Sequence, residues 1–383
     1  MLNFRKIIAL TAAVLTVSAF PVSGAEPAGE NIIITDMIGR ELDVTPGSYS
    51  RVVCIGAGAL RMYTYICGSE YLCGVEDIDN TSLEDRPKMF DSAARPYIIA
   101  YGNDFTELPS CGVGGPNAQT AEAEMILSCN PDIVISFYQD VEKEDALQSQ
   151  LGVPVVTLMS GPGGVFDERF KDSLRLLGTL FEREARAEEL IFFINAESDE
   201  ISSRTSDIPE DTKPSVYICG LGNWGTASHL TTAQNYNVFD IAHIKNVVQG
   251  LEGGMLQTIE EEKFVSLGGE MDIMIMDAAA VKNIAASYSG DNTMFDVCKA
   301  WNNNEVYMEM AYNAYYTNYE IALANAWFAG KCVYPELFND IDMTDKTDKI
   351  TEMFLGQPLA DEIFAYPTSF GGYGKVAAGD IFR

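Results

Sequence analysis

Histidine is scarce in this sequence, with only His229 and His243 among 383 residues. The two are too far apart to form an i, i+4 pair on one helix, so the sequence shows no histidine-rich zinc or manganese site. His243 is expected to be structural, and His229 either packs in a core or lines a cleft. A nucleophile elbow, an H-E-x-x-H helix and a P-loop are also missing, so no catalytic arrangement stands out.

Basic residues are scarce as well: 25 Lys and Arg stand against 56 Asp and Glu, which gives a formal net charge of −31. A chain this acidic is a poor candidate for binding nucleic acid through phosphates or for docking on an anionic membrane. The remaining composition is that of a globular protein, with 47% hydrophobic and 21% charged residues. The length allows two domains with sizeable cores.

Long apolar runs are confined to the first 25 residues, which have the pattern of a secretory signal. Arg5 and Lys6 precede an apolar stretch at residues 7–20, and small residues lead up to Ala25. We expect cleavage near Ala25, the alternative being an uncleaved N-terminal anchor helix. No cysteine follows the apolar stretch, so a lipobox is not indicated. The mature chain is therefore expected to be periplasmic or extracellular.

The eight cysteines contain no C-x-x-C pair, which argues against a zinc ribbon or a redox motif. Cys54 and Cys219 each lie in an apolar, β-branched run typical of a buried strand. Cysteine acts as a small hydrophobic residue in such positions. We expect mostly free thiols.

Strand-like and helix-like segments alternate after residue 30, which predicts α/β structure. A long helical pattern at residues 167–204 is followed by a polar break, and the alternation then restarts. The predicted fold has two Rossmann-like lobes joined by a single long bridging helix, with a ligand cleft between the lobes. The expected boundaries are residues 26–165 for the first lobe, 166–205 for the connecting helical region and 206–383 for the second lobe.

The segment from Gly56 to Arg61 follows a predicted strand and opens a helix, and Glu76 comes 20 residues after Gly56. This spacing imitates a dinucleotide-binding fingerprint, but Arg61 replaces the third glycine. We interpret it as a strand-to-helix turn that faces a cleft. Arg61 either binds an anionic ligand group with its two-pronged guanidinium or forms a surface ion pair.

Aromatic residues are densest at residues 311–319, which contain Tyr312, Tyr315, Tyr316 and Tyr319. The segment lies between a predicted strand and a predicted helix, so it is expected at the carboxyl edge of a sheet, where ligands bind in α/β folds. Tyrosine combines flat apolar area with a hydroxyl, which suits a chelate or a macrocycle. At least two of the four rings are expected simply to pack.

Several segments resemble the iron-siderophore and vitamin B12 class of ABC-transporter substrate-binding proteins. The most specific match is Glu124 followed by an aliphatic stretch and then Asn130-Pro131-Asp132-Ile133. Residues 324–335 resemble a subgroup described as iron-complex binders. The other matching segments are residues 51–56, 74–76 and 186–190.

The resemblance implies a ligand held between two lobes that close little. It also implies that one glutamate on each lobe docks with a permease dimer, which works with a cytoplasmic ATPase. Glu124 matches the first docking residue, although a helix N-terminus favours a glutamate in any protein. Glu262 is the nearest match to the second, with Glu260 and Glu261 as alternatives because the sequence departs from the family pattern at residues 268–272.

Matching of loops to the iron-complex subgroup assigns a set of ligand-binding residues. They are Arg61, Tyr97, Tyr101, Trp224, Thr231, Thr232 and Tyr315. The implied function is an extracytoplasmic solute-binding protein, a monomer without cofactor, resident metal or catalytic residues, that delivers a ferric siderophore-type chelate to an importer. A corrinoid or haem cargo is the alternative within this class, and an exported enzyme or a sensor on the same scaffold is the alternative outside it.

Overall fold

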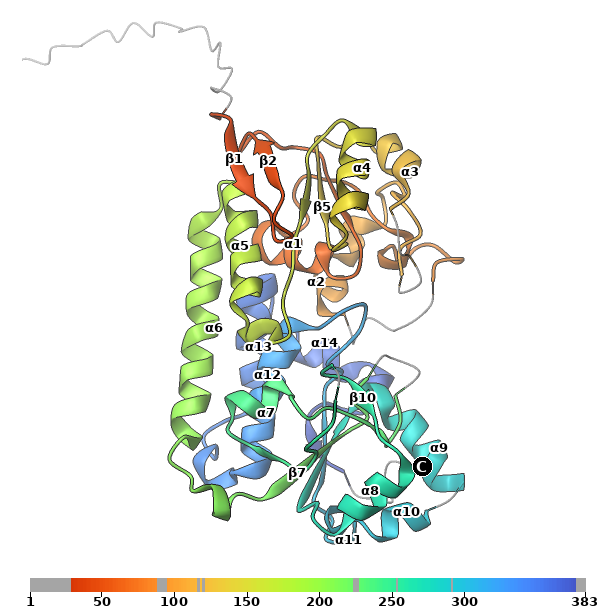
Figure 1. The fold of residues 1–383 in the computed structure, drawn as a ribbon, viewed down its shortest axis with the longest axis vertical. Helices are drawn as coiled ribbons and strands as arrows, with labels where there is room; N and C mark the ends of the chain where they lie inside the picture. The colour runs from red at the N-terminus through yellow and green to blue at the C-terminus, as the bar shows by residue number, and fades with distance from the viewer. Residues whose placement is uncertain are drawn as a thin grey trace, which may run out of the picture.

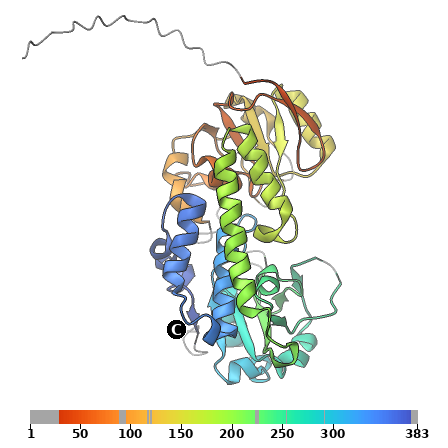
Figure 2. The ribbon, with the colours of Figure 1, turned by 90° about the vertical axis from the view of Figure 1, so that its left-hand side faces the viewer.

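The computed structural model describes residues 29–87, 95–115, 118, 121–222, 227–252, 254–290 and 292–376. The predicted signal at residues 1–25 and the candidate ligand residue Trp224 lie outside this part of the chain. Two α/β lobes stand one above the other, and helix α6 (Glu184–Thr205) runs beside both (Figures 1 and 2). The predicted fold class is confirmed.

The first lobe is built on a parallel sheet with the order β4-β3-β5-β6. Its strands are β3 (Val52–Ile55), β4 (Leu72–Gly74), β5 (Ile133–Ser136) and β6 (Val155–Thr157). Every residue of β3, β5 and β6 is buried, as expected for a sheet that helices cover on both faces. The helices are α1 (Ala59–Cys67), α2 (Pro96–Phe105), α3 (Ala123–Ser128) and α4 (Val141–Leu151), and an antiparallel pair, β1 (Ile32–Thr35) and β2 (Glu41–Val44), precedes the sheet.

The connecting region contains two helices within the long helical pattern expected at residues 167–204. Helix α5 (Glu168–Leu180) ends before Glu182, which has a positive φ of 52°, and α6 then runs for 22 residues. At 1.5 Å per residue α6 is about 33 Å long, enough to reach along both lobes. Gly178 lets the two helices approach closely, since a Cβ there would lie 3.0 Å from the Cβ of Ala187.

The second lobe has a sheet with the order β13-β12-β11-β7-β9. Its strands β7 (Ser215–Cys219), β9 (Lys245–Asn246), β11 (Ile273–Asp277) and β12 (Val306–Glu309) are parallel, and β13 (Gly374–Lys375) is antiparallel. A short pair, β8 (Thr231–Thr232) with β10 (Gln257–Thr258), lies beside this sheet. The helices are α7 (Asn237–Ile241), α8 (Glu261–Gly268), α9 (Val281–Gly290), α10 (Thr293–Asp296), α11 (Lys299–Asn302) and α12 (Tyr319–Val333).

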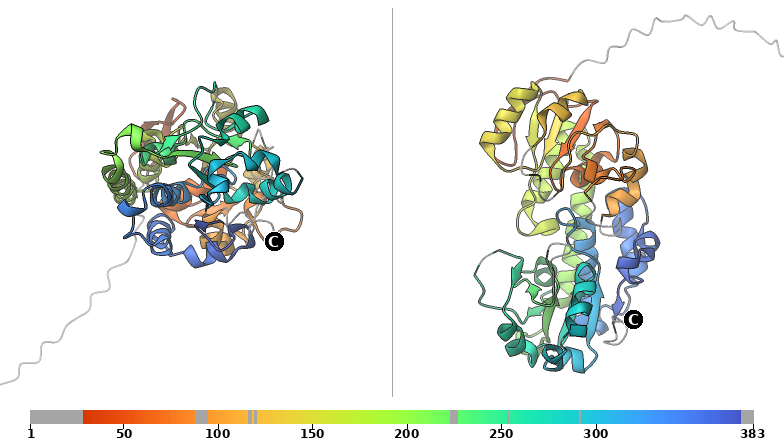
Figure 3. Two further views of the ribbon diagram at one scale, coloured as in Figure 1. Left: turned by 90° about the horizontal axis from the view of Figure 1, so that it is seen from below. Right: turned by 90° about the vertical axis from the view of Figure 1, so that its right-hand side faces the viewer.

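The last two helices, α13 (Met343–Leu355) and α14 (Ala360–Ala365), return toward the first lobe and contact α2. Buried Glu197 of α6 holds α13 by ion pairs to Lys346 at 2.9 Å and Lys349 at 2.7 Å. Figure 3 shows these helices bridging the lobes beside α12. Among the helices of the described residues, none is both long enough and apolar enough to cross a membrane.

Candidate ligand-binding site

The carboxyl ends of the parallel strands in the two sheets face each other between the lobes. In the first lobe, β3 runs into the turn at Gly56 and Gly58, whose φ values of 84° and 106° suit glycine. In the second lobe, β12 runs into residues 310–318, here called the tyrosine loop, which leads into α12. The two segments touch, because a Cβ on Gly58 would lie 3.5 Å from the Cβ of Tyr316. The predicted position of the tyrosines at a sheet edge is therefore confirmed.

The tyrosine loop has an unusual backbone. Tyr315 and Tyr316 have consecutive positive φ values of 51° and 77°. Each such non-glycine residue costs roughly 1–3 kcal/mol, so contacts outside the loop must stabilise it. On its own lobe, the Tyr312 backbone N–H donates to the Asp277 carboxyl at 2.9 Å, and the Asn325 side-chain amide of α12 donates to the Met310 carbonyl at 2.9 Å.

Arg61 of α1 supplies the main contact from the opposite lobe. Its Nη1 donates to the carbonyl oxygens of Thr317 at 2.7 Å and Tyr315 at 3.2 Å, and its Nη2 donates to the carbonyl of Ala314 at 2.6 Å. The side chain is only 1% exposed. Neither the surface ion pair nor an open anion-binding group describes this arrangement, in which the guanidinium binds the protein's own backbone.

Glu76 forms a second contact between the lobes. Its carboxyl accepts hydrogen bonds from the Tyr315 hydroxyl at 2.6 Å and from the Gly56 backbone N–H at 3.1 Å. The Gly115 backbone N–H in turn donates to the Tyr315 hydroxyl at 3.0 Å. Burial raises the pKa of Glu76 to about 7, although both hydrogen bonds favour the ionised form.

Two buried carboxyls of the second lobe support the base of the tyrosine loop. Asp277 ends β11, and burial raises its pKa to about 7 against the effect of its backbone hydrogen bonds. Glu309 ends β12 and accepts a hydrogen bond from the Tyr236 hydroxyl at 2.6 Å, while burial raises its pKa well above the usual range. Burial thus raises the pKa of Glu76 on the first lobe and of Asp277 and Glu309 at the ends of second-lobe strands.

The six sequence-predicted ligand residues that the structure describes lie in three places: around Arg61, at Tyr101 and on β8 of the second lobe. Arg61, Tyr97 and Tyr315 lie together, since the Arg61 guanidinium lies 4.9 Å from the centroid of the Tyr97 ring. Tyr101 lies elsewhere, with its hydroxyl donating to the Leu355 carbonyl of α13 at 2.7 Å.

Thr231 and Thr232 lie in the second lobe on β8, and both hydroxyls donate to backbone carbonyls, those of Ser228 and Ile218. The contact of these residues with a ligand stays a prediction. His229 packs in the second-lobe core, where its ring lies 5.2 Å from that of Phe264 and 5.1 Å from that of Phe295.

Sequence reasoning did not select Tyr316 or Phe137. Tyr316 is 39% exposed, whereas Tyr312, Tyr315 and Tyr319 are buried, as expected for at least two of the four rings. The Tyr316 ring packs edge-on against Phe137, 4.8 Å between centroids, and its hydroxyl lies 3.5 Å from the Ser160 hydroxyl. The cluster of tyrosines in the sequence indicated this loop. Only the structure shows that Tyr316 is the exposed ring among them.

The two candidate docking glutamates lie on different lobes. Glu124 is exposed in the first turn of α3, and Glu262 is exposed in the first turn of α8. Both helices lie on the side of the molecule away from α6 (Figure 1). Glu260 and Glu261 are exposed too, so burial does not distinguish among the three second-lobe glutamates.

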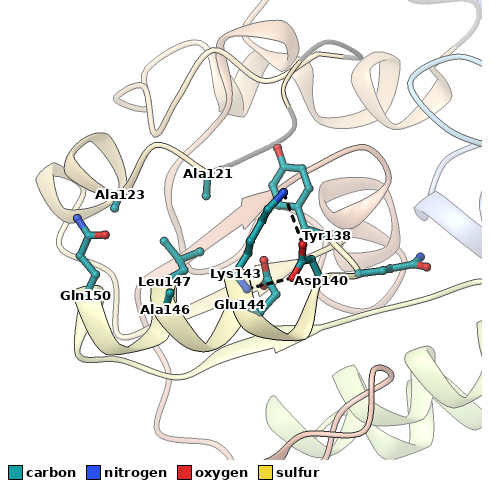
Figure 4. Close-up of a pocket in the computed structure, with 10 residues that line it drawn as sticks. Ala121, Ala123, Tyr138, Asp140, Lys143, Glu144, Ala146, Leu147 and Gln150 are labelled. Carbon is teal, nitrogen blue, oxygen red and sulfur yellow. Dashed lines mark hydrogen bonds and ion pairs between the residues drawn. The ribbon is translucent and has the colours of Figure 1, made fainter.

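A pocket of about 320 Å³ lies on the first lobe between α3 and α4. Figure 4 shows Tyr138 at one end and Ala123 and Gln150 at the other, with Lys143 paired to Asp140 at 3.6 Å. All of its lining residues fall within residues 121–150, so this pocket involves one lobe only and is distinct from the predicted cleft.

Comparison with known proteins decides the family. Residues 98–317, more than half of the chain, match the family described as periplasmic binding protein. The chain belongs to this family. It is therefore the binding protein of an ABC transporter, which works with a membrane permease and an ATPase, and the family implies a periplasmic location. No curated protein sequence matches the chain.

Solved structures show the same fold at low sequence identity. A periplasmic solute-binding protein from Veillonella parvula has a TM-score of 0.65 at 18% identity, covering 87% of this chain and 95% of its own. The molybdate-binding protein MolA of Haemophilus influenzae, bound to molybdate, has a TM-score of 0.65 at 16% identity, covering 85% and 98%. The TroA-like protein FepB of Veillonella parvula has a TM-score of 0.62 at 18% identity, covering 85% and 97%.

Proposed function

We propose that this binding protein captures an iron complex of the siderophore type between its lobes and delivers it to the permease. The observation that carries the proposal is the tyrosine loop, which presents the partly exposed Tyr316 ring beside Phe137, where the loop touches the turn at Gly58 of the other lobe. Phenol rings offer flat apolar area and a hydroxyl to the organic part of a chelate. The resemblance of residues 324–335 to iron-complex binders supports the choice of cargo.

A ligand titration tests the cargo. The mature chain from Glu26 is titrated with ferric complexes of citrate, a trihydroxamate and a tricatecholate, and with haem, cobalamin, molybdate and free Fe(III), following intrinsic fluorescence. We expect saturable one-to-one binding of one ferric chelate and much weaker binding of the same chelator without iron. Binding of cobalamin, haem or molybdate alone contradicts the proposed cargo and leaves the transporter role intact.

Charge reversal tests the docking residues. Glu124→Lys and Glu262→Lys each place a cation where the proposal requires an anion to meet a permease arginine, so uptake with the cognate permease should fall at least tenfold while the dissociation constant for the ligand stays within twofold. Glu142→Lys is the matched control, because Glu142 is also an exposed glutamate in the first turn of a helix, α4. Uptake that survives both reversals contradicts the docking assignment.

A further inference from the structure

The tyrosine loop is attached to the first lobe through backbone atoms, which a change of side chains within the loop would not remove. Three acceptors within four residues of the loop, the carbonyls of Ala314, Tyr315 and Thr317, are bound by one guanidinium. A guanidinium presents its donors in a rigid planar fork, whereas a lysine ammonium is a point donor on a flexible stem. The three-carbonyl contact is therefore specific to arginine at position 61.

A side chain of the first lobe also contacts the Arg61 guanidinium. The Tyr97 ring lies under the guanidinium, and the Tyr97 hydroxyl donates to Asp79 at 2.6 Å. Arg95 also binds Asp79, at 2.7 Å, in an ion pair that is almost fully buried. The ring that packs on Arg61 is thus itself held by a buried hydrogen bond and a buried ion pair of the first lobe.

Two adjacent rings of the loop, those of Tyr315 and Tyr316, have different surroundings. Tyr315 points into the first lobe, where its hydroxyl bonds to Glu76 and accepts from Gly115. Tyr316, the next residue, has a positive φ and keeps 39% of its surface exposed between Phe137 and Ser160. Arg61 binds the carbonyls of Tyr315 and Thr317, the residues on either side of Tyr316, and the Tyr315 hydroxyl binds Glu76. These bonds therefore fix the position of the Tyr316 ring relative to the first lobe.

We propose that Arg61 and Tyr315 are positioning residues that clamp the tyrosine loop to the first lobe, and that Tyr316, held by this clamp, contacts the ligand and determines which complex is accepted. This inference rests on the proposed function and assigns Arg61 a different task from anion recognition. The clamp holds the Tyr316 ring against Phe137 of the opposite lobe, so the exposed part of the ring has a fixed position and discriminates ligands by shape.

The test uses four variants of the mature chain: Tyr316→Ala, Arg61→Lys, Tyr315→Phe and the double variant Arg61→Lys/Tyr316→Ala. Tyr71→Ala is the matched control, because Tyr71 is 41% exposed and also has a positive φ, but it stacks on Phe181 at the end of α5, away from the tyrosine loop. Dissociation constants for the three ferric chelates are measured beside hydrogen exchange of the amides at residues 314–318 in the ligand-free protein.

We expect Tyr316→Ala to weaken the preferred chelate at least tenfold and to reduce its preference over the other two, while Tyr71→Ala stays within twofold. Arg61→Lys should speed loop exchange at least tenfold and weaken the same chelate. Tyr315→Phe removes one hydroxyl and should have a smaller effect in the same direction. The double variant should bind the chelate no more weakly than the weaker-binding single variant. Both changes act through the position of the same Tyr316 ring, so their effects on the dissociation constant should not add.

Two results would overturn the clamp. One is unchanged loop exchange in both Arg61→Lys and Tyr315→Phe. The other is an Arg61→Lys protein that loses only the most anionic chelate, which would make Arg61 a ligand contact. If the wild-type chain binds none of the chelates, the proposed cargo and the ligand role of Tyr316 fail, and exchange in the ligand-free variants still decides the clamp.

Discussion

The buried carboxyl of Glu76 makes the stability of this protein depend on pH in a defined direction. Its pKa is about 7 in the folded protein, raised from 4.5 mainly by burial. A group whose pKa rises on folding contributes stability below its unfolded pKa, and this contribution is lost as the pH rises through the folded value. Each pKa unit corresponds to about 1.4 kcal/mol, so Glu76 contributes about 3 kcal/mol at pH 4 that is absent at pH 8.

Glu76→Gln removes this titration and keeps the shape of the side chain. The amide oxygen still accepts from the Gly56 N–H, and the amide nitrogen can donate to the Tyr315 hydroxyl. The free energy of unfolding is measured with urea at pH 5, 6, 7 and 8, following the fluorescence of the buried Trp301 and Trp327. We expect the wild type to lose about 2–3 kcal/mol relative to the variant across this range.

Glu124→Gln is the control for the same measurement, since it removes an exposed carboxyl from the same lobe. Its unfolding free energy should run parallel to that of the wild type. Parallel curves for Glu76→Gln would refute the reasoning, because they would show that Glu76 titrates alike in the folded and unfolded chains.

Two further predictions concern the cores. All eight cysteines are free and buried in the structure, so an aromatic disulfide reagent should label almost none of them in the native protein and all eight in guanidinium. Labelling of fewer than eight in guanidinium without reductant would reveal disulfides. Gly330→Ala should lower the free energy of unfolding by about 1–3 kcal/mol in urea, because a Cβ there would lie 2.6 Å from the Phe338 ring. An unchanged midpoint of the urea transition would show that the ring moves aside without cost.

Much of the fold could be predicted because its strands carry a strong local signal. The run at residues 52–55 and the one at residues 215–219 are apolar and β-branched, and both form central, almost fully buried strands. The helical pattern at residues 167–204 was harder to divide, because its one glycine, Gly178, lies inside α5 and not at the break at Glu182.

The site was predictable only in part. Sequence reasoning placed Arg61 at a strand-to-helix turn and the tyrosines at a sheet edge, and both placements are confirmed. The partners of Arg61 are backbone carbonyls more than 250 residues away, and carbonyls leave no mark in a sequence. Glu76 was noted for its spacing from Gly56, and the structure explains that spacing by a hydrogen bond rather than by a nucleotide.

The central claim is that a ligand binds between the lobes, against the tyrosine loop and the Gly56 turn. Its most direct test is hydrogen exchange of the wild-type chain with and without the chelate that saturates it. The account predicts added protection at residues 56–61 and 312–318 on the two lobes together, with little change at α4. Protection confined to one lobe, or to the pocket between α3 and α4, would contradict it.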